Sequence, residues 1–202
     1  MSTPLARPAA RQMWAALRML VVMTVVVGLA YPLAMTAFAQ VVFPDRADGS
    51  IVEQKRQPVG SSLIGQSFDG NPGYFQSRPS AAGDGYDPLA SSASNLGPEN
   101  EDLITAIEER RRAAAQLDGT DPAKVAPDAL LASGSGLDPH ISPEYTEQQV
   151  ARVARERGLS EDAVRALVAE NTEGRIVGFL GEPHVNVLLL NLALDNASGP
   201  AD

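Results

Sequence analysis

The sequence contains no cysteine, which excludes disulfide bonds, thiolate metal ligands and a cysteine nucleophile. It has only two lysines, Lys55 and Lys124, and neither follows a glycine, so a Walker A phosphate-binding loop is excluded. No serine lies in G-x-S-x-G or S-x-x-K, the local signatures of serine acyl-transfer sites. These absences exclude several motif-based enzyme classes, and the sequence predicts no catalytic residue.

Histidine is equally scarce. The two histidines, His140 and His184, lie outside any H-E-x-x-H arrangement. Each follows a carboxylate by two positions, Asp138 and Glu182, which leaves open a metal site assembled by folding. Catalytic zinc usually needs three protein ligands, so we expect hydrogen bonding in loops rather than a metal at these histidines.

Charge is missing altogether from Met19 to Pro44, which is 26 consecutive positions made mostly of Val, Leu, Met and Ala. Roughly 20 apolar residues in a helix cross a hydrocarbon core about 30 Å thick. Gly28 and Pro32 lie inside this run; both are tolerated in membrane helices, and Pro32 predicts a kink. The sequence therefore predicts a transmembrane helix over residues 19–43, preceded by a tail of residues 1–18.

A cleaved signal peptide is the alternative, because Ala37-Phe38-Ala39 resembles a cleavage site. The apolar run far exceeds the roughly 7–15 residues of a signal core, which favours an uncleaved anchor. Arg7, Arg11 and Arg18 precede the run, whereas the charges just after it are mixed. Because positive residues stay inside, we expect a cytoplasmic N-terminus in the plasma (inner) membrane and an extracytoplasmic, or periplasmic, C-terminal domain.

The apolar run also carries small residues, which let neighbouring helices approach closely in a bilayer. We therefore predict that these small residues let the helix pack closely against another membrane helix. The small residues proposed for this contact are Gly28, Ala30, Ala34 and Ala37.

The charge that is present is divided unevenly along the chain. Residues 1–18 carry +3, whereas the chain from Asp45 onward has 13 basic and 25 acidic residues, a net charge of −12. Such a surface repels phosphate backbones, so we expect no nucleic-acid partner. Residues 155–168 resemble a helix-turn-helix, but the second helix begins with Glu161 and Asp162, so we interpret it as a corner of two helices in the core.

Residues 44–194 predict an extracytoplasmic α+β domain, followed by a tail of residues 195–202. Residues 69–98 show no apolar period and many turn signals, but their aromatic side chains favour packing over disorder. Helices are expected over Glu99–Leu117, from the cap Ser142 to Gly158, and from the cap Ser160 to about Asn171. Strands are expected at Gly49–Glu53, Ser61–Phe68, Arg175–Leu180 and Val185–Leu194, the last covered on both faces.

The loop before Ser142 is built of small residues, Ala132-Ser-Gly-Ser-Gly-Leu-Asp138. Backbone N–H groups in such a loop can surround an anion. The loop has no lysine, however, and Asp138 has the wrong charge for phosphate. We therefore favour a tight structural turn over a phosphate site.

Several long motifs, in order, resemble the C subunit of the Kdp-type potassium-transporting ATPases. The resemblance runs from the membrane helix to about Leu194. Its motifs are Gly60-Ser-Ser-Leu-Ile-Gly-Gln66, Tyr74-Phe75 with Ser77-Arg-Pro-Ser-Ala81, Tyr86-Asp87, Ala90-Ser-Ser-Ala-Ser-Asn-Leu-Gly-Pro98, Ala132-Ser-Gly-Ser-Gly-Leu-Asp-Pro-His-Ile-Ser142, Arg175 with Gly178-Phe-Leu-Gly-Glu-Pro183, and Val185-Asn-Val-Leu-Leu-Leu-Asn191.

This resemblance implies a non-catalytic subunit of a high-affinity potassium uptake complex. Its partners would be a potassium-translocating A subunit, an ATP-hydrolysing B subunit and a small F subunit, within the bilayer. The family is described as a catalytic chaperone that raises the ATP affinity of the B subunit. The loop Ser133, Gly134, Ser135 and Gly136 matches the region proposed to touch nucleotide, so ATP would be bound only together with the B subunit and no cofactor would be held tightly.

The implied nucleotide contact conflicts with the orientation deduced from the arginines, because ATP is cytoplasmic and the loop is expected outside. Assembly fits both lines of reasoning: the membrane helix would pack on the A subunit, and the outer domain would cap the external entrance of the potassium path. The alternative class is a membrane-anchored extracytoplasmic hydrolase or binding protein unrelated to transport, although no nucleophile–base spacing is visible.

Overall fold

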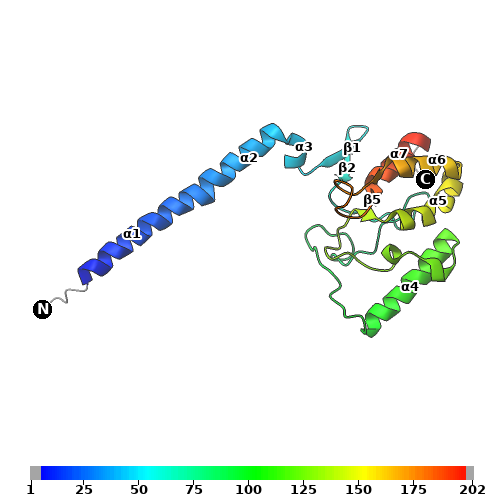
Figure 1. Cartoon of the computed structure of the whole chain (residues 1–202), viewed down its shortest axis with the longest axis horizontal. Coiled ribbons are helices and arrows are strands. Elements are labelled where there is room, and N and C mark those ends of the chain that lie inside the picture. The colour runs from blue at the N-terminus through cyan, green and yellow to red at the C-terminus, as the bar shows by residue number, and fades with distance from the viewer. Residues whose placement is uncertain (1–5, 199–202) are drawn as a thin grey trace. The chain divides into compact units, whose positions relative to one another are not determined.

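The computed structural model describes residues 6–198, and the chain divides between Ser50 and Ile51 into two compact units (Figure 1). Each unit has its own local structure and is described by itself. The N-terminal unit consists of α1 (Ala6–Val25), the π-helical turn η1 (Val26–Ala30), α2 (Tyr31–Val42) and the short α3 (Pro44–Ala47).

The N-terminal unit is one long apolar helix. Residues Ala9–Val42 form 34 helical residues with a mean hydropathy of 2.1 over their most apolar window, and none of that window is buried. The predicted span of residues 19–43 coincides with its C-terminal part, and residues 6–18 of the expected tail continue the same helix. Residues 1–5 of the expected tail lie outside the described residues.

The π-helical turn η1 directly precedes Pro32. Proline has no backbone N–H, and its ring collides with the carbonyl oxygen four residues earlier in a regular helix. Widening the turn over Val26–Ala30 relieves that collision while the chain stays helical on both sides. The expected disturbance at Pro32 is therefore accommodated by one wide turn.

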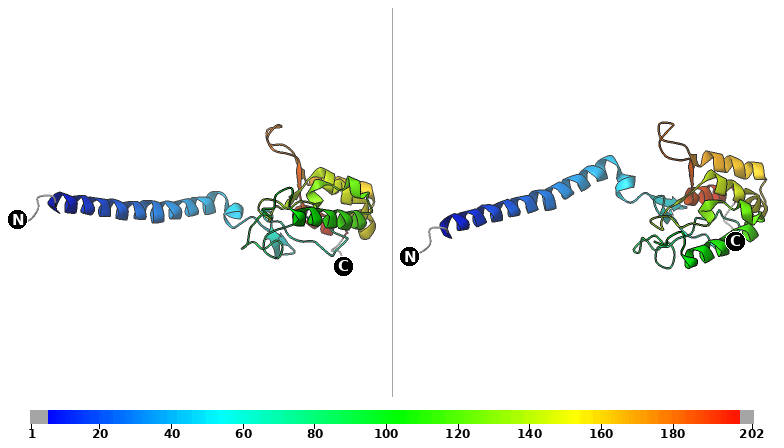
Figure 2. Two further views of the ribbon diagram at one scale, coloured as in Figure 1. Left: turned by 90° about the horizontal axis from the view of Figure 1, so that it is seen from below. Right: turned by 60° about the horizontal axis from the view of Figure 1, so that its bottom comes forward.

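The C-terminal unit is a mixed helix and sheet domain, so the predicted α+β class behind one apolar helix is confirmed (Figures 1 and 2). Its sheets are small: β1 and β2 form an antiparallel hairpin, and three short antiparallel strands lie in the order β3-β5-β4. The elements are β1 (Ile51–Gln54), β2 (Gln57–Ser61), α4 (Glu101–Asp118), η2 (Pro122–Lys124), η3 (Pro127–Ala129), β3 (His140–Ile141), α5 (Pro143–Arg157), α6 (Glu161–Glu170), β4 (Thr172–Glu173), β5 (His184–Asn186) and α7 (Val187–Ser198).

The predicted helix boundaries are confirmed where capping residues were visible in the sequence. The Ser142 and Ser160 side chains accept hydrogen bonds from Tyr145 N and Ala163 N at the starts of α5 and α6. Gly158 ends α5 with a positive φ of 65°. Helices α5 and α6 meet through buried side chains of the core, as the predicted corner requires, and Val150, Val153 and Val164 are fully buried.

The prediction of a long strand over Val185–Leu194 is wrong. Only His184–Asn186 are extended, and helix α7 begins at Val187. The Asn186 side chain accepts a hydrogen bond from Leu189 N, which is the geometry of an N-cap. A ten-residue apolar run fits a buried helix as well as a strand, and this cap decides between them. Helix α7 continues to Ser198, into the expected tail, of which residues 199–202 lie outside the described residues.

Two other strand predictions also fail. Residues 62–68 are not extended, since β2 ends at Ser61. Arg175–Leu180 forms a tight turn closed by a single bridge between Ile176 and Leu180. The prediction for Gly49–Glu53 is close to the observed β1, which begins at Ile51.

Candidate functional site

The serine–glycine loop at residues 133–136 is tied to a distant part of the chain. Ser92 N donates a hydrogen bond to Ser135 O (3.0 Å), and Ser91 Oγ donates another to the same oxygen (3.0 Å). Ser80 Oγ donates to Gly136 O at 2.6 Å. The loop therefore holds the irregular segment of residues 62–100 in place.

Gly136 lies at the centre of this contact. Its φ of +69° favours glycine, and a Cβ at this position would lie 2.7 Å from Ala82 N and 2.7 Å from Ser92 O. Ser133 is buried, and the amides of Gly136 and Leu137 already donate hydrogen bonds within the loop. The predicted tight turn thus has a structural reason, while nucleotide contact by Ser133, Gly134, Ser135 and Gly136 stays a prediction.

Asp138, which follows the loop, is the charged centre of this region. It pairs with Arg78 at 3.0 Å and accepts hydrogen bonds from the His140 amide and, at 3.2 Å, the His140 ring. Burial of the carboxyl group opposes ionisation, but the hydrogen bonds from His140 and the charge of Arg78 outweigh it and lower the pKa of Asp138. This carboxylate therefore stays ionised and connects the loop to Arg78 of the irregular segment.

The fold brings the two histidines together across β3 and β5. Their rings meet edge to face with centroids 4.5 Å apart. The His140 ring contacts Asp138, and His184 Nδ1 lies 2.9 Å from Glu182 O. Among the described residues no group of three or more His, Asp or Glu side chains is arranged to hold a metal ion. Both histidines are thus engaged in local hydrogen bonding.

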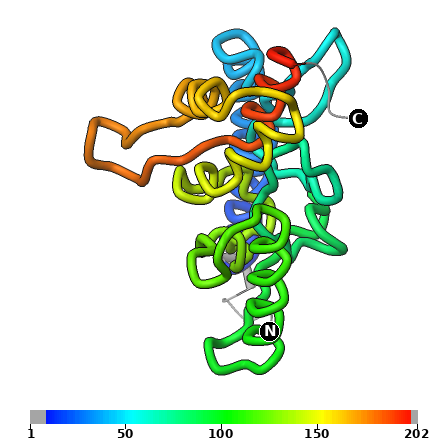
Figure 3. The backbone as a smooth tube through the Cα atoms, turned by 90° about the vertical axis from the view of Figure 1, so that its right-hand side faces the viewer, coloured from blue at the N-terminus to red at the C-terminus, as the bar shows by residue number. Residues whose placement is uncertain are grey.

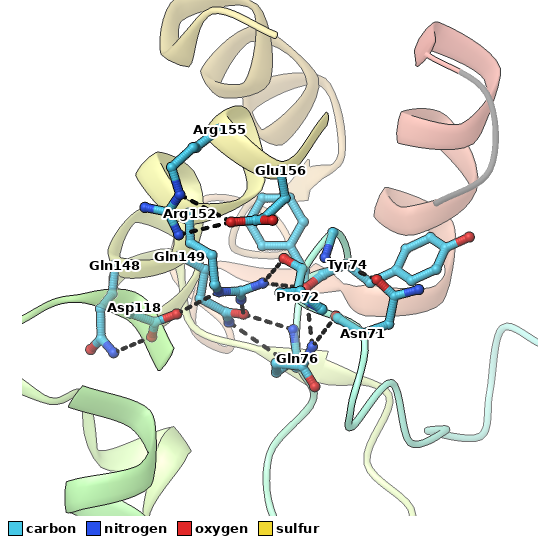
Figure 4. A network of polar contacts seen from close by, with 12 residues as sticks. Asn71, Pro72, Tyr74, Gln76, Asp118, Gln148, Gln149, Arg152, Arg155 and Glu156 are labelled. Carbon is cyan, nitrogen blue, oxygen red and sulfur yellow. Dashed lines mark hydrogen bonds and ion pairs between the residues drawn. The ribbon is translucent and has the colours of Figure 1, made fainter. Parts of the chain in front are cut away.

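Arg152 of α5 is the largest fully buried side chain among the described residues of the C-terminal unit, and Figure 4 shows it surrounded by polar groups. Its Nε donates to Asp118 of α4 at 2.8 Å, and its Nη1 donates to Tyr74 O at 2.8 Å and to Pro72 O. Its Nη2 donates to Gln149 Oε1 at 2.6 Å. One side chain therefore links two helices to the irregular segment.

Gln149 and Asn191 take the place of a neighbouring strand for this segment. Gln149 accepts from Gln76 N at 2.7 Å and donates to Gln76 O at 3.2 Å. Asn191 of α7 makes the same pair of bonds with Phe75, at 2.9 and 3.0 Å. Because buried backbone groups must be hydrogen-bonded, these two amides allow an irregular chain to pass through the core.

A second ion pair anchors α7. Arg157 pairs with Asp195 at 2.8 Å and stacks over the Tyr74 ring, with its guanidinium carbon 4.5 Å from the ring centroid. Tyr74 Oη donates to the same Asp195 at 3.1 Å. Asp195 belonged to the expected tail, but it is part of the folded domain.

A cleft of about 420 Å³, lined by both polar and apolar side chains, lies between α4 and the segment containing Arg78 and Tyr86. Burial raises the pKa of Tyr86 to about 12, and it raises the pKa of Tyr145, at the bottom of the cleft, further. The Tyr145 hydroxyl makes no hydrogen bond to a described residue, whereas Tyr86 donates to Arg78 O. Both phenols are therefore neutral at physiological pH.

Sequence analysis missed Arg152, Gln149, Asn191 and Tyr145. A signal for the first two exists: Gln149 and Arg152 are polar residues on the face of α5 that also carries Val150 and Val153. Polar side chains on an apolar helix face predict buried hydrogen bonds. Their partners lie about 75 residues away and cannot be read from spacing.

The small residues of the apolar helix are exposed, and none of them is buried against another part of residues 6–198. A Cβ on Gly28 would meet only Thr24 Cγ2, at 3.8 Å, so the helix itself does not require glycine there. Ala30, Ala34 and Ala37 follow at spacings of four and three residues, which places them on one side of a helix. All four lie on surface exposed within the described residues.

Comparison with known proteins gives one consistent result. Residues 13–196 match the family model KdpC, described as K+-transporting ATPase, c chain. The chain is 64% identical over 188 residues to the potassium-transporting ATPase KdpC subunit of Kineococcus radiotolerans, covering 93% of this chain and 95% of the relative. It is 56% identical over 183 residues to the KdpC subunit of Sorangium cellulosum, covering 90% and 96%. The chain therefore belongs to the KdpC family, the c chains of the potassium-transporting ATPases.

Proposed function

We propose that the chain is a single-pass, non-catalytic subunit that holds the potassium-transporting ATPase together from the outer side of the membrane. This proposal rests on the N-terminal helix, which is 34 residues long and strongly apolar, although no residue of its most apolar window is buried. Such a helix needs lipid and neighbouring helices as its environment.

The proposed orientation rests on charge. Arg7, Arg11 and Arg18 precede the span, and the positive-inside tendency keeps them cytoplasmic. The outer domain is then extracytoplasmic, in the plasma (inner) membrane. There it contacts the potassium-translocating A subunit and caps the entrance of the potassium path.

An effect on ATP binding by the B subunit is compatible with this arrangement only as long-range coupling. The outer domain would have to bind two states of the complex with different affinities. The hydrogen bonds of the serine–glycine loop to residues 80–92 favour a structural role for Ser133 to Gly136 over direct nucleotide contact. The same topology separates the C-terminal domain from cytoplasmic ATP.

Three measurements test the proposal. A reporter that is active only outside the membrane, fused after Asp202, is expected to be active; an active cytoplasmic reporter at that position would overturn the orientation. Purification of the wild-type chain from native membranes in mild detergent is expected to recover the A, B and F subunits, and an isolated chain would contradict the assembly role. Mass spectrometry of the N-terminus separates the anchor from a cleaved signal peptide.

The helix contact has its own test. Gly28→Leu and Ala34→Phe replace small residues with large ones, and both are expected to weaken retention with the A subunit because helices in lipid associate by close packing. Leu33→Phe, which enlarges an already large exposed residue, is the matched control. If both variants co-purify as well as wild type, the outer domain alone holds the complex.

A further inference from the structure

The most exposed apolar cluster of the outer domain is the connection between β4 and β5. Figure 3 shows this segment, residues 174–183, standing away from the body of the domain, and Figure 2 shows it from two other sides. Its tip is the sequence Ile176-Val-Gly-Phe-Leu180. The exposed fractions are 71% for Ile176, 78% for Val177, 73% for Phe179 and 51% for Leu180.

The tip is a turn closed by backbone hydrogen bonds. Ile176 and Leu180 exchange backbone hydrogen bonds at 2.9 and 3.0 Å. Val177 has a φ of +53°, which is unfavourable for a β-branched residue, and Gly178 follows with +83°. At the base, Arg175 and Glu182 form an ion pair at 2.7 Å. A closed turn that presents large apolar side chains on a strained backbone is typical of a contact surface.

From these features we infer that the tip, residues 176–180, inserts into an apolar pocket on the extracytoplasmic surface of a membrane-embedded subunit of the ATPase. This inference rests on the proposed function for the side of the membrane. Two properties of the chain indicate which kind of partner the tip contacts.

The first property is size. A stable interface buries about 800 Å² on each partner, and four side chains supply only a fraction of that. Such a contact holds when the two surfaces are already tethered together, because tethering raises their effective concentration. Only residues 43–50 separate the apolar helix, ending at Val42, from β1 at Ile51. The partner is therefore a protein held in the same membrane.

The second property is charge. Arg175 is neutralised by Glu182, which leaves Glu173 as the remaining charge at the base of the turn, 3.7 Å from His184 Nε2. The chain from Asp45 onward carries −12. Anionic lipid headgroups would be repelled by this surface, so a protein pocket with a neutral or basic rim fits better than the bilayer surface.

The test uses the whole complex, purified in mild detergent. The double variant Ile176→Asp/Phe179→Asp is expected to reduce the amount of chain retained per membrane-embedded subunit roughly tenfold or more, since tenfold corresponds to the loss of about one well-buried apolar contact. Leu89→Asp is the matched control, because Leu89 is 96% exposed on another loop; it should leave retention unchanged. The melting temperature of each variant shows whether the domain is still folded.

The outcomes separate this inference from the proposed function. If wild-type chain fails to co-purify, the proposed function is wrong and the tip loses its partner with it. If wild type and the double variant are retained equally, the proposed function stands and the tip is not the contact. A photo-crosslinker at Phe179 is expected to label a membrane-embedded subunit; labelling of lipid alone would also overturn the inference.

Discussion

The two units of this chain are stabilised in opposite ways. In the N-terminal unit no residue of the most apolar window is buried, whereas the C-terminal unit, residues 51–198 of the described chain, has a core of fully buried side chains around Phe75, Val150 and Leu190. The C-terminal unit also satisfies the buried backbone of its irregular segment with its own side chains. The C-terminal unit is therefore stabilised by internal contacts, whereas the apolar helix has no buried core of its own among the described residues.

The largest loss in the free energy of unfolding is expected from Arg152→Met. The substitution keeps the approximate length of the side chain but removes the charged partner of the buried Asp118, to which the Gln148 amide still donates. It also removes the guanidinium donor from Pro72 O and Tyr74 O. Removing one partner of a buried ion pair costs about 3–5 kcal/mol. We expect that loss in the free energy of unfolding of the C-terminal unit, measured by chemical denaturation of the full chain in detergent.

Arg155→Met is the control for this experiment. Arg155 lies on the same helix, three residues later, and forms an exposed ion pair with Glu156. An exposed pair contributes about 0–1 kcal/mol. Equal losses from the two substitutions would show that the buried network does not hold the irregular segment.

A smaller loss is expected from Asn191→Leu. The change removes both hydrogen bonds to the Phe75 backbone and leaves that amide and carbonyl buried. Each unsatisfied buried group costs about 1–3 kcal/mol, partly offset here by the added apolar contact, so we expect a net loss of about 2 kcal/mol. Asn196→Leu, on the exposed side of the same helix, should change stability by less than about 0.5 kcal/mol.

Asp138→Asn is expected to have a smaller, pH-dependent effect. The folded state lowers the pKa of Asp138, so its ionised form contributes stability that is present above the pKa of the unfolded chain. That contribution is lost as the pH falls through the lower folded pKa. Wild type should therefore melt higher than the variant at pH 7, and the difference should shrink below about pH 4. A difference that grows on acidification would contradict the role of the charge.

The smallest effect on folding is expected from Gly28→Leu. A Cβ at Gly28 meets nothing closer than 3.8 Å, so the change should not alter the stability of the C-terminal unit. Its unfolding free energy should match that of wild type within about 0.5 kcal/mol. A larger shift would mean that the two units are energetically coupled.

Much of the fold is predictable from local signals. The apolar run, the caps Ser142 and Ser160 and the stop at Gly158 lie within a few residues of the elements they define. The strand predicted over Val185–Leu194 is wrong because ten apolar residues fit a helix or a strand, and the side chain of Asn186 caps a helix here by accepting a hydrogen bond from Leu189 N.

The site is less predictable because its contacts join residues far apart in sequence. The serine–glycine loop was recognisable by composition, but its partners Ser80 and Ser92 lie more than 40 residues away. The same holds for Arg152 and Tyr74, whose contact depends on the path of a segment without regular structure. Local periodicity carries no information about such pairs.

The C-terminal unit is stabilised by its own internal contacts, and we predict that its retention in the complex depends on the membrane helix. Cutting the purified complex at a protease site placed between Asp48 and Ile51 tests this prediction most directly. We expect the released C-terminal unit to keep its melting temperature and to dissociate from the membrane-embedded subunits, because the tip alone is too small a contact. A C-terminal unit that unfolds on cleavage, or that stays bound to the complex, would contradict the prediction.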